Sequence, residues 1–223
     1  MQNTIASPSS KASPEILGRM RPSFLYSLVA LVSWPILKGL YRLRAEGKEN
    51  LPGDGGYVLA ANHVSNFDPW PLGMPLWPKR FLRFMAKSEL YWWPLGAIIT
   101  AGGGFPVRRG ERDIEAMNRA IQLVRDGNVV AMFPHGTRRR KGLVKRYQPR
   151  AHTGAARIAL EAGVPLVPAA IEGTDRLTRL GQLRVRYGKP IPVDDLQHLD
   201  QSAAAKEATE RLIAEIARLE TGL

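Results

Sequence analysis

At 223 residues, the chain is long enough for one domain with a substantial hydrophobic core. Its 44% hydrophobic and 23% charged residues are typical of a globular protein, and its lack of cysteine excludes disulfides, thiolate metal sites and a cysteine nucleophile. The formal net charge of +12 implies an anionic partner, which could be nucleic acid, a phospholipid surface or a phosphorylated substrate.

The N-terminal part divides into two segments of different character. Residues 1–15 are polar and rich in serine and proline, which predicts a disordered N-terminus. A secretory signal is not expected, because the apolar stretch begins too late and no small-residue cleavage site follows it. Residues 16–44 contain an apolar run, 24–37, with aromatic residues within it and basic residues on both sides.

This apolar run is shorter than the roughly 20 residues that span a bilayer, and Pro35 interrupts it. Its composition suits a helical segment that lies in a membrane interface beside anionic headgroups. A core helix of a soluble domain and a single membrane span are the alternatives. We therefore predict a membrane-interface helical segment at 16–44 and one folded domain at 45–223.

The rest of the chain alternates short apolar runs with amphipathic stretches, which predicts an α/β fold. Strands are expected at 57–61, 81–86, 128–133, 164–171 and 183–187, and helices at 87–93, 111–125, 150–162 and 203–219. Residues 47–56 and 102–109 are interpreted as turns. We expect a single mixed β-sheet flanked by helices, with functional residues in the loops at strand ends.

The first candidate site is the segment from Asn62 to Pro69, which leaves the strand at 57–61 and opens a helix. On one continuous helix, His63 and Asp68 would point roughly 140° apart, but across a strand–turn–helix junction the carboxylate can fold back onto the imidazole. One ring nitrogen would then donate to Asp68, and the other could accept a substrate proton. The alternative is a surface histidine near an ordinary capping aspartate.

Two further loops are expected at the same edge of the sheet. Residues 102–109 combine three glycines with Arg108, which suits a phosphate held by exposed amide groups and a bidentate cation. The loop at 134–142 leaves a strand through a tight turn, presents Thr137 and Arg138, and opens a strongly basic run. The alternatives are a flexible turn in the first case and a basic solvated loop in the second.

Four segments together carry a family resemblance: Asn62-His63-x4-Asp68, Gly-x-x-Phe-x-x-Arg at 102–108, Phe-Pro-x-Gly-Thr-Arg at 133–138, and Val-Pro-Leu-Val-Pro at 164–168. In this order and with these separations, they resemble the conserved blocks of the glycerolipid acyltransferases. The chain is most similar to the bacterial 1-acylglycerol-3-phosphate (lysophosphatidic acid) acyltransferases.

The resemblance implies transfer of an acyl group from acyl-CoA or acyl-carrier protein to the sn-2 hydroxyl of 1-acylglycerol-3-phosphate, which gives phosphatidic acid for phospholipid synthesis. His63 would be the general base, and Asp68 would orient it and support its charge. The hydroxyl would attack the thioester directly, without a metal or any cofactor beyond the acyl-donor co-substrate. Ser65 lacks the glycine-flanked elbow of a serine nucleophile. The substrate phosphate would be bound by Arg108, Arg138, Lys87, Gly136 and Thr137.

The resemblance also implies the partners. They are lysophosphatidate, the acyl thioester, an anionic membrane surface and, where it is the donor, acyl-carrier protein. The implied location is the cytoplasmic face of the cell membrane, for a peripheral or monotopic protein. Nucleic acid is not expected, because the basic run lacks interleaved aromatic residues and matches no common binding module.

One position departs from the family pattern, because residue 135 is His where the third block normally has Glu. A carboxylate there would accept hydrogen bonds from acceptor hydroxyls or neighbouring cations, whereas imidazole accepts one at most. The change is consistent with a tolerated substitution, with an acyltransferase for another lyso-lipid acceptor, or with a catalytically impaired lipid-binding membrane protein. A metal site of His63, Asp68 and His135 is discounted, because the resemblance implies a reaction that needs no metal.

Overall fold

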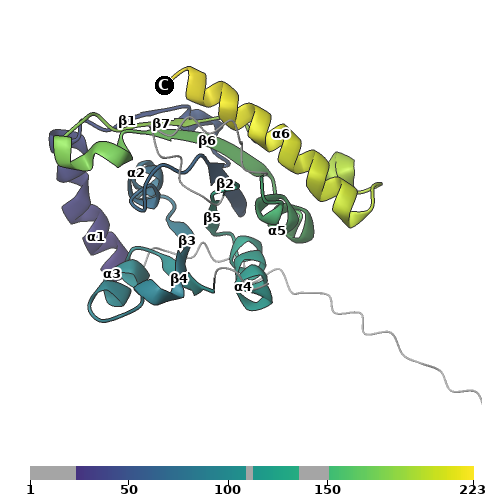
Figure 1. Ribbon diagram of the computed structural model, residues 1–223, viewed down its shortest axis with the longest axis horizontal. Helices are drawn as coiled ribbons and strands as arrows, with labels where there is room; N and C mark the ends of the chain where they lie inside the picture. The colour runs from purple at the N-terminus through teal and green to yellow at the C-terminus, as the bar shows by residue number, and fades with distance from the viewer. Residues whose placement is uncertain (1–23, 109–112, 136–150) are drawn as a thin grey trace, which may run out of the picture.

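Seven strands form one sheet in the computed structural model, which describes residues 24–108, 113–135 and 151–223. The strands are β1 (Arg44–Glu46), β2 (Tyr57–Ala61), β3 (Leu82–Lys87), β4 (Gly104–Val107), β5 (Val129–Met132), β6 (Leu166–Glu172) and β7 (Arg184–Tyr187). Their order across the sheet is β1-β7-β6-β2-β5-β3-β4 (Figure 1). β6 and β7 pair antiparallel, and the other described pairs are parallel. The predicted α/β fold with a single mixed sheet is confirmed.

Helices lie on both faces of the sheet (Figure 1). The α-helices are α1 (Phe24–Pro35), α2 (Pro69–Gly73), α3 (Leu95–Ala101), α4 (Ile114–Arg125), α5 (Gly154–Ala162) and α6 (Gln201–Thr221). The shorter elements are the π-helical turn η2 (Ile36–Leu40) and the 3-10 turns η3 (Lys48–Asn50), η4 (Met74–Leu76), η5 (Ser88–Leu90), η6 (Thr174–Arg179) and η7 (Asp194–Leu196).

The central strands are buried on both faces, as their continuous apolar sequences predict for a parallel sheet. All five residues of β2 are buried, and so are the first six of β6. One face packs against α1 and α2, and the opposite face packs against α4, α5 and α6. Because helices cover both faces, the loops at the strand ends are the surfaces left for function.

Two edge strands depart from the sequence-based expectation. β4 lies within the predicted turn at 102–109, because the turn is confined to Gly102 and Gly103 and the chain then pairs with β3. Gly103 has a φ of +95°, a conformation that L-residues with a side chain rarely adopt. β1, which the sequence does not predict, pairs with β7 at the far edge.

The prediction of a helix at 87–93 is wrong beyond the first turn. The 3-10 turn η5 ends at Leu90, and α3 begins only at Leu95. Trp93 precedes Pro94, and a residue in front of proline is sterically disfavoured in helical conformation. The helix therefore starts after Pro94, and Trp92 and Trp93 lie in an exposed connection.

α1 and η2 lie within the predicted membrane-interface segment, whereas the predicted disordered residues 1–15 lie outside the described residues. One side of this helical stretch is buried against the sheet, through Tyr26, Ala30 and Leu37. Its other side is exposed and apolar over Phe24, Leu25, Leu28, Leu31 and Val32. None of the helices in the described ranges is both long enough and apolar enough to cross a membrane.

Candidate active site

The predicted site residues follow parallel strands, so their loops meet at one edge of the sheet. His63 follows β2, His135 follows β5, Lys87 ends β3 and Arg108 follows β4. Because the strands lie in the order β2-β5-β3-β4, these residues form a row in that same order. Three strand spacings separate the ends of the row, or about 14 Å between the main chains of β2 and β4.

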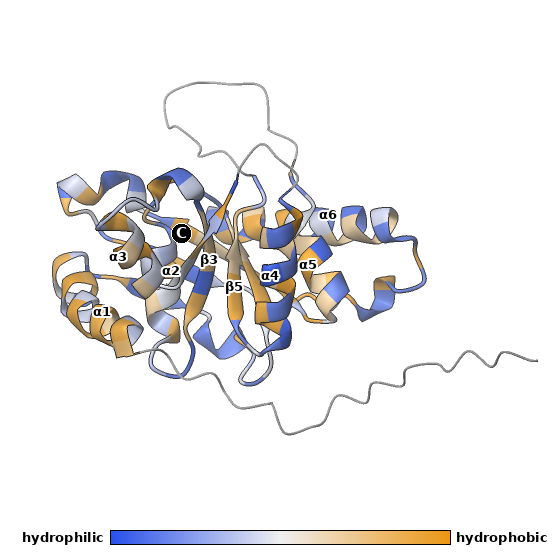
Figure 2. Ribbon diagram, turned by 90° about the horizontal axis from the view of Figure 1, so that it is seen from below, coloured by the Kyte–Doolittle hydropathy of each residue, from blue (hydrophilic) through white to orange (hydrophobic). Residues whose placement is uncertain are grey.

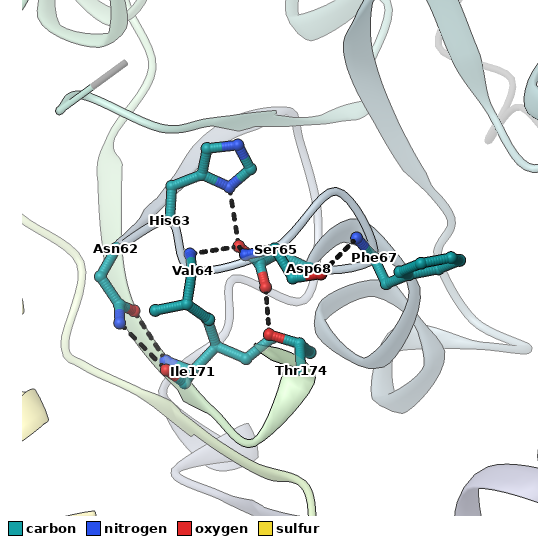
Figure 3. A network of polar contacts seen from close by, with 8 residues as sticks. All are labelled: Asn62, His63, Val64, Ser65, Phe67, Asp68, Ile171 and Thr174. Atoms are coloured by element: carbon teal, nitrogen blue, oxygen red, sulfur yellow. Dashed lines mark hydrogen bonds and ion pairs between the residues drawn. The ribbon is translucent and has the colours of Figure 1, made fainter. Parts of the chain in front are cut away.

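Asp68 folds back onto His63, as the strand–turn–helix junction predicts (Figure 3). Its Oδ2 atom accepts hydrogen bonds from His63 Nδ1 at 2.7 Å and from the N–H groups of Val64 and Ser65 at 2.8 Å and 3.0 Å. Asp68 precedes the first residue of α2, but its side chain makes no cap to that helix. Both partners are buried, with His63 6% exposed and Asp68 fully enclosed.

This contact determines which nitrogen of His63 is available for chemistry. An ionised carboxylate can only accept hydrogen bonds, so Nδ1 carries the proton that lies against Asp68. The neutral ring then has Nε2 as its acceptor, on the side away from Asp68 (Figure 3). A buried imidazole held in this tautomer by a carboxylate can remove a proton from a hydroxyl and later return it.

A hydroxyl group completes the surroundings of the carboxylate. The Oδ1 atom of Asp68 accepts a hydrogen bond from Oγ1 of Thr174, which lies at the start of η6, directly after β6 and Gly173 (Figure 3). Thr174 is 2% exposed. The sequence did not indicate this residue, because it lies 106 residues from Asp68 and no local spacing connects the two.

Asn62 connects the same loop to the main chain of β6. Its Nδ2 donates to the carbonyl of Ile171 at 3.0 Å, and its Oδ1 accepts from the Ile171 N–H at 2.8 Å (Figure 3). The amide thus continues the parallel β2–β6 pairing by one more step beyond the strand. The predicted motif segment is consequently held at both of its ends by β6 and η6.

Lys87 and Arg108 lie at the ends of the neighbouring strands β3 and β4, at the far end of the row. Lys87 pairs with Val107, so Arg108 follows directly, and both side chains are exposed. The main-chain N–H of Arg108 donates to Oδ2 of Asp113 at 2.8 Å, while Oδ1 of Asp113 caps α4 by accepting from the Ala116 N–H. These two hydrogen bonds hold the pKa of the Asp113 carboxyl below its usual range.

The remaining predicted phosphate-binding residues, Gly136, Thr137 and Arg138, lie outside the described residues. His135 is half-buried at the end of β5. Over the described ranges, no three His, Asp or Glu side chains gather closely enough to hold a metal ion. The described site therefore consists of a buried imidazole–carboxylate pair at one end and two exposed cations at the other.

Comparison with known proteins shows which family the sequence matches. A sequence model described as Acyltransferase matches residues 42–172. The 1-acyl-sn-glycerol-3-phosphate acyltransferase of Bacillus subtilis is 33% identical over 188 residues, which cover 81% of this chain and 89% of that protein. The protein of the same name from Streptococcus pneumoniae is 28% identical over 212 residues, which cover 91% of this chain and 74% of that protein.

A solved structure has the same fold. The crystal structure of the 1-acyl-sn-glycerophosphate acyltransferase PlsC from Thermotoga maritima matches with a TM-score of 0.57 and 23% identity, over 87% of this chain and 86% of that one. Together with the sequence matches, these findings establish that the chain belongs to the Acyltransferase family and is an enzyme of that class.

Proposed function

We propose that this chain transfers an acyl group from acyl-CoA or acyl-carrier protein to the sn-2 hydroxyl of 1-acylglycerol-3-phosphate, with phosphatidic acid as the product. The observation that carries the proposal is the buried hydrogen bond between His63 Nδ1 and Asp68 Oδ2. The relatives named as 1-acyl-sn-glycerol-3-phosphate acyltransferases support the choice of acceptor.

The proposed reaction is a direct acyl transfer. Nε2 of His63 removes the proton from the sn-2 hydroxyl as the oxygen attacks the thioester carbonyl and forms a tetrahedral intermediate. The intermediate collapses with cleavage of the C–S bond, and the departing thiolate takes the proton from the imidazolium. Asp68 stabilises the positive charge of the ring between the two steps. A C–O bond replaces the C–S bond, and His63 returns to its starting state.

The contacts of Ser65 favour this direct route over an acyl-enzyme. Its main-chain N–H donates to Asp68, and its hydroxyl oxygen accepts from the Phe67 N–H at 3.3 Å. A serine nucleophile would instead need its hydroxyl directed at the base. Ser65 therefore serves the turn, and the attacking oxygen is that of the substrate.

The acceptor phosphate is assigned to the cations that lie in the same row of strand ends as His63. Lys87 and Arg108 supply exposed positive charge, and Gly136, Thr137 and Arg138 are proposed to add donors from the loop after β5. β5 lies between β2 and β3, so that loop starts between His63 and Lys87. An acceptor whose phosphate binds at these cations would extend toward His63 with its hydroxyl.

The membrane partner is assigned to the side of the molecule that carries α1 and α3. These two helices are in contact, and α1 is largely apolar along its length (Figures 1 and 2). Exposed apolar side chains on this side include Phe24, Leu28, Leu31, Trp92, Trp93 and Ile98, which we call the apolar surface. Exposed Lys38, Arg42 and Arg44 follow α1, which suits anionic headgroups. We propose peripheral or monotopic attachment at the cytoplasmic face of the cell membrane.

A second candidate function follows from His135 at the end of β5. Because this residue differs from the glutamate usual in the family, the same chemistry on another lyso-lipid acceptor is the alternative. A catalytically impaired lipid-binding protein is less well supported, because the hydrogen bonds around His63 and Asp68 are intact.

The decisive test is transfer of a labelled acyl group to lysophosphatidate in detergent, with acyl-CoA and acyl-carrier protein compared as donors. We expect wild-type activity and, for His63→Ala, a fall in kcat on the order of 10²–10⁴-fold. His198→Ala is the matched control, because His198 is exposed and lies between η7 and α6. Unchanged turnover by folded His63→Ala would remove the base assignment, and transfer only to other lyso-lipids would replace the proposed acceptor.

A further inference from the structure

We propose that Thr174 is a positioning residue for the reaction, which acts through Asp68 to hold the imidazole of His63 in its reactive orientation. The inference rests on the proposed role of His63 as the base. It concerns a residue outside the four motif segments. Thr174 follows β6, the strand that pairs with β2, and His63 follows β2.

The hydrogen bonds around Asp68 come from two separate parts of the chain. The three donors to Oδ2 belong to residues 63–65, in the same loop as Asp68 itself. The donor to Oδ1 is the hydroxyl of Thr174, from the segment after β6. Without this second contact, the carboxylate would be held through one oxygen only, and its rotation about the Cβ–Cγ bond would be less restricted.

The direction of this hydrogen bond follows from the chemistry of the two groups. An ionised carboxylate has no proton to give, so the Thr174 hydroxyl donates. Asp68 is fully enclosed, so water cannot replace this donor when it is removed. A buried carboxylate oxygen without a partner is unfavourable, and the side chain would rotate or shift to recover one. Either movement displaces Oδ2 and, with it, the ring of His63.

The main chain presents Thr174 to Asp68 by a turn that only glycine accommodates well. Gly173 has a φ of +96°, and a Cβ atom there would collide with the carbonyl oxygen of Gln182. Gly173 also occupies the position before η6, so the Thr174 side chain is not used as a helix cap. The described hydrogen bond of its hydroxyl goes to Asp68.

Thr174 differs in role from Asn62, the other contact between the loop and β6. Asn62 bonds to the main chain of Ile171, so its loss should lower the stability of the fold. Thr174 bonds to the carboxylate that orients the base, so its loss should appear in the chemical step. The two roles can therefore be separated by measuring kcat, KM and thermal stability on the same variants.

The experiment compares Thr174→Val, Thr174→Ser and Thr209→Val in the 223-residue protein. Valine keeps the shape of threonine without its hydroxyl, and serine keeps the hydroxyl. Thr209 is the matched control, because it is also buried and donates its hydroxyl, at 2.6 Å, to the carbonyl of Ala205 within α6. We expect Thr174→Val to lower kcat on the order of ten- to a hundredfold with KM unchanged, because a displacement of about 1 Å at a reactive group can reduce a rate on the order of a hundredfold. Thr174→Ser should restore kcat, and Thr209→Val should match wild type.

A second readout does not depend on the substrate. The proton between His63 Nδ1 and Asp68 should give a downfield resonance in the proton NMR spectrum, identified by its absence in His63→Gln. It should shift in Thr174→Val and stay in place in Thr209→Val. An unshifted resonance, or a kcat for folded Thr174→Val equal to that of Thr209→Val, would overturn the inference.

Two further outcomes can be distinguished from a failure of the inference about Thr174. If the wild-type protein transfers nothing to lysophosphatidate, the proposed acceptor fails, while the resonance still decides the role of Thr174. If Thr174→Val does not fold, Thr174→Cys replaces it, because a thiol is a weaker donor of comparable size. A kcat for Thr174→Cys below that of Thr174→Ser supports the inference, and equal values contradict it.

Discussion

The ring of Phe133 lies against the imidazole of His63, with the two ring centroids 4.3 Å apart and an angle of 25° between their planes. Phe133 follows β5, the neighbour of the strand that carries His63. Asp68 holds one edge of the imidazole by a hydrogen bond, and Phe133 covers one of its faces. Rotation of the ring about its Cβ–Cγ bond is therefore restricted from two directions.

Replacing Phe133 by leucine should lower kcat, because the imidazole gains freedom to turn while its hydrogen bond to Asp68 remains. A displacement of about 1 Å at a reactive group can reduce a rate on the order of a hundredfold, so we expect a loss between ten- and a hundredfold. Phe81→Leu is the control, because Phe81 is buried in the core beside Tyr26. Steady-state kinetics on the folded variants measures the two kcat values. Equal kcat values for both variants would contradict a role for the stacking of Phe133 on His63.

Asn62→Ala should destabilise the fold, because the N–H and C=O groups of Ile171 both lose their partner. At about 1–3 kcal/mol for each of the two buried groups left unpaired, the free energy of unfolding should fall by about 2–6 kcal/mol. Asn128→Ala is the comparison, since its Nδ2 also donates to a buried carbonyl, that of Leu123, but its Oδ1 has no described partner. Urea unfolding should give a smaller loss for Asn128→Ala, and the reverse order would count against the assignment.

Asp113→Ala should weaken binding of the acceptor, because the main chain of Arg108 loses the carboxylate that accepts its N–H. We expect KM for lysophosphatidate to rise several-fold with kcat little changed. Asp113→Asn should behave like wild type, since asparagine is also a good helix cap. An unchanged KM in Asp113→Ala would separate Arg108 from the acceptor site.

The same carboxylate predicts a pH dependence of stability. The hydrogen bonds from Arg108 and Ala116 lower the pKa of Asp113 in the folded state. The Asp113 carboxylate therefore contributes to the free energy of unfolding at pH values above its pKa in the unfolded chain, which is roughly 3.9. This contribution is lost as the pH falls through the lower pKa of the folded state. The difference in thermal midpoint between wild type and Asp113→Ala should be constant near neutral pH and should shrink below about pH 4.

His135→Glu should change which acceptor is preferred. A carboxylate in the turn after β5 can accept several hydrogen bonds from nearby cations and hold them toward the phosphate monoester that lysophosphatidylcholine lacks, and hydrogen bonds to charged groups contribute about 1.5–3 kcal/mol. The ratio of kcat/KM for lysophosphatidate to that for lysophosphatidylcholine should therefore rise by about tenfold or more. His135→Gln, which supplies one neutral acceptor, is the control. Equal ratios for the two variants would show that the charge at this position is unimportant.

Trp93→Ser should reduce binding to vesicles, because Trp93 is 85% exposed within the apolar surface. Loss of one buried aromatic side chain from a membrane contact corresponds to roughly 2 kcal/mol, so we expect partitioning to fall by more than tenfold. Ile114→Ser is the matched control, because Ile114 is 67% exposed at the start of α4, on the opposite face of the sheet. Sedimentation with anionic and neutral vesicles measures the vesicle binding of both variants. An equal loss of binding in the two variants would place the membrane contact elsewhere.

Much of the fold follows from local sequence signals. β2, β5 and β6 are continuous apolar runs, and these become the buried centre of the sheet. The edge strands β1 and β4 give no such signal. β1 is only three residues long and carries two charges, and β4 begins with glycine and contains Pro106, both of which are typical of turns. Their strand conformation results from the neighbours they pair with, which a local pattern does not contain.

Local sequence signals likewise predict some contacts of the candidate site and not others. His63 and Asp68 could be paired from the sequence, because they lie five residues apart across a junction that allows only a few geometries. The contacts of Thr174 and Phe133 could not, since each depends on which strands are neighbours in the finished sheet. Sequence reasoning thus finds the reacting pair, and the structure adds the residues that restrain it.

The pairing of β1 with β7 has a consequence for synthesis on the ribosome. These strands join residues about 140 positions apart, so β1 has no partner until nearly the whole domain has been translated. α1 is made earlier still, and its apolar residues emerge before the strands that cover its inner side exist. Under the proposed membrane attachment, the nascent chain would present α1 to a bilayer while the catalytic half is unmade, so attachment would precede folding of the domain.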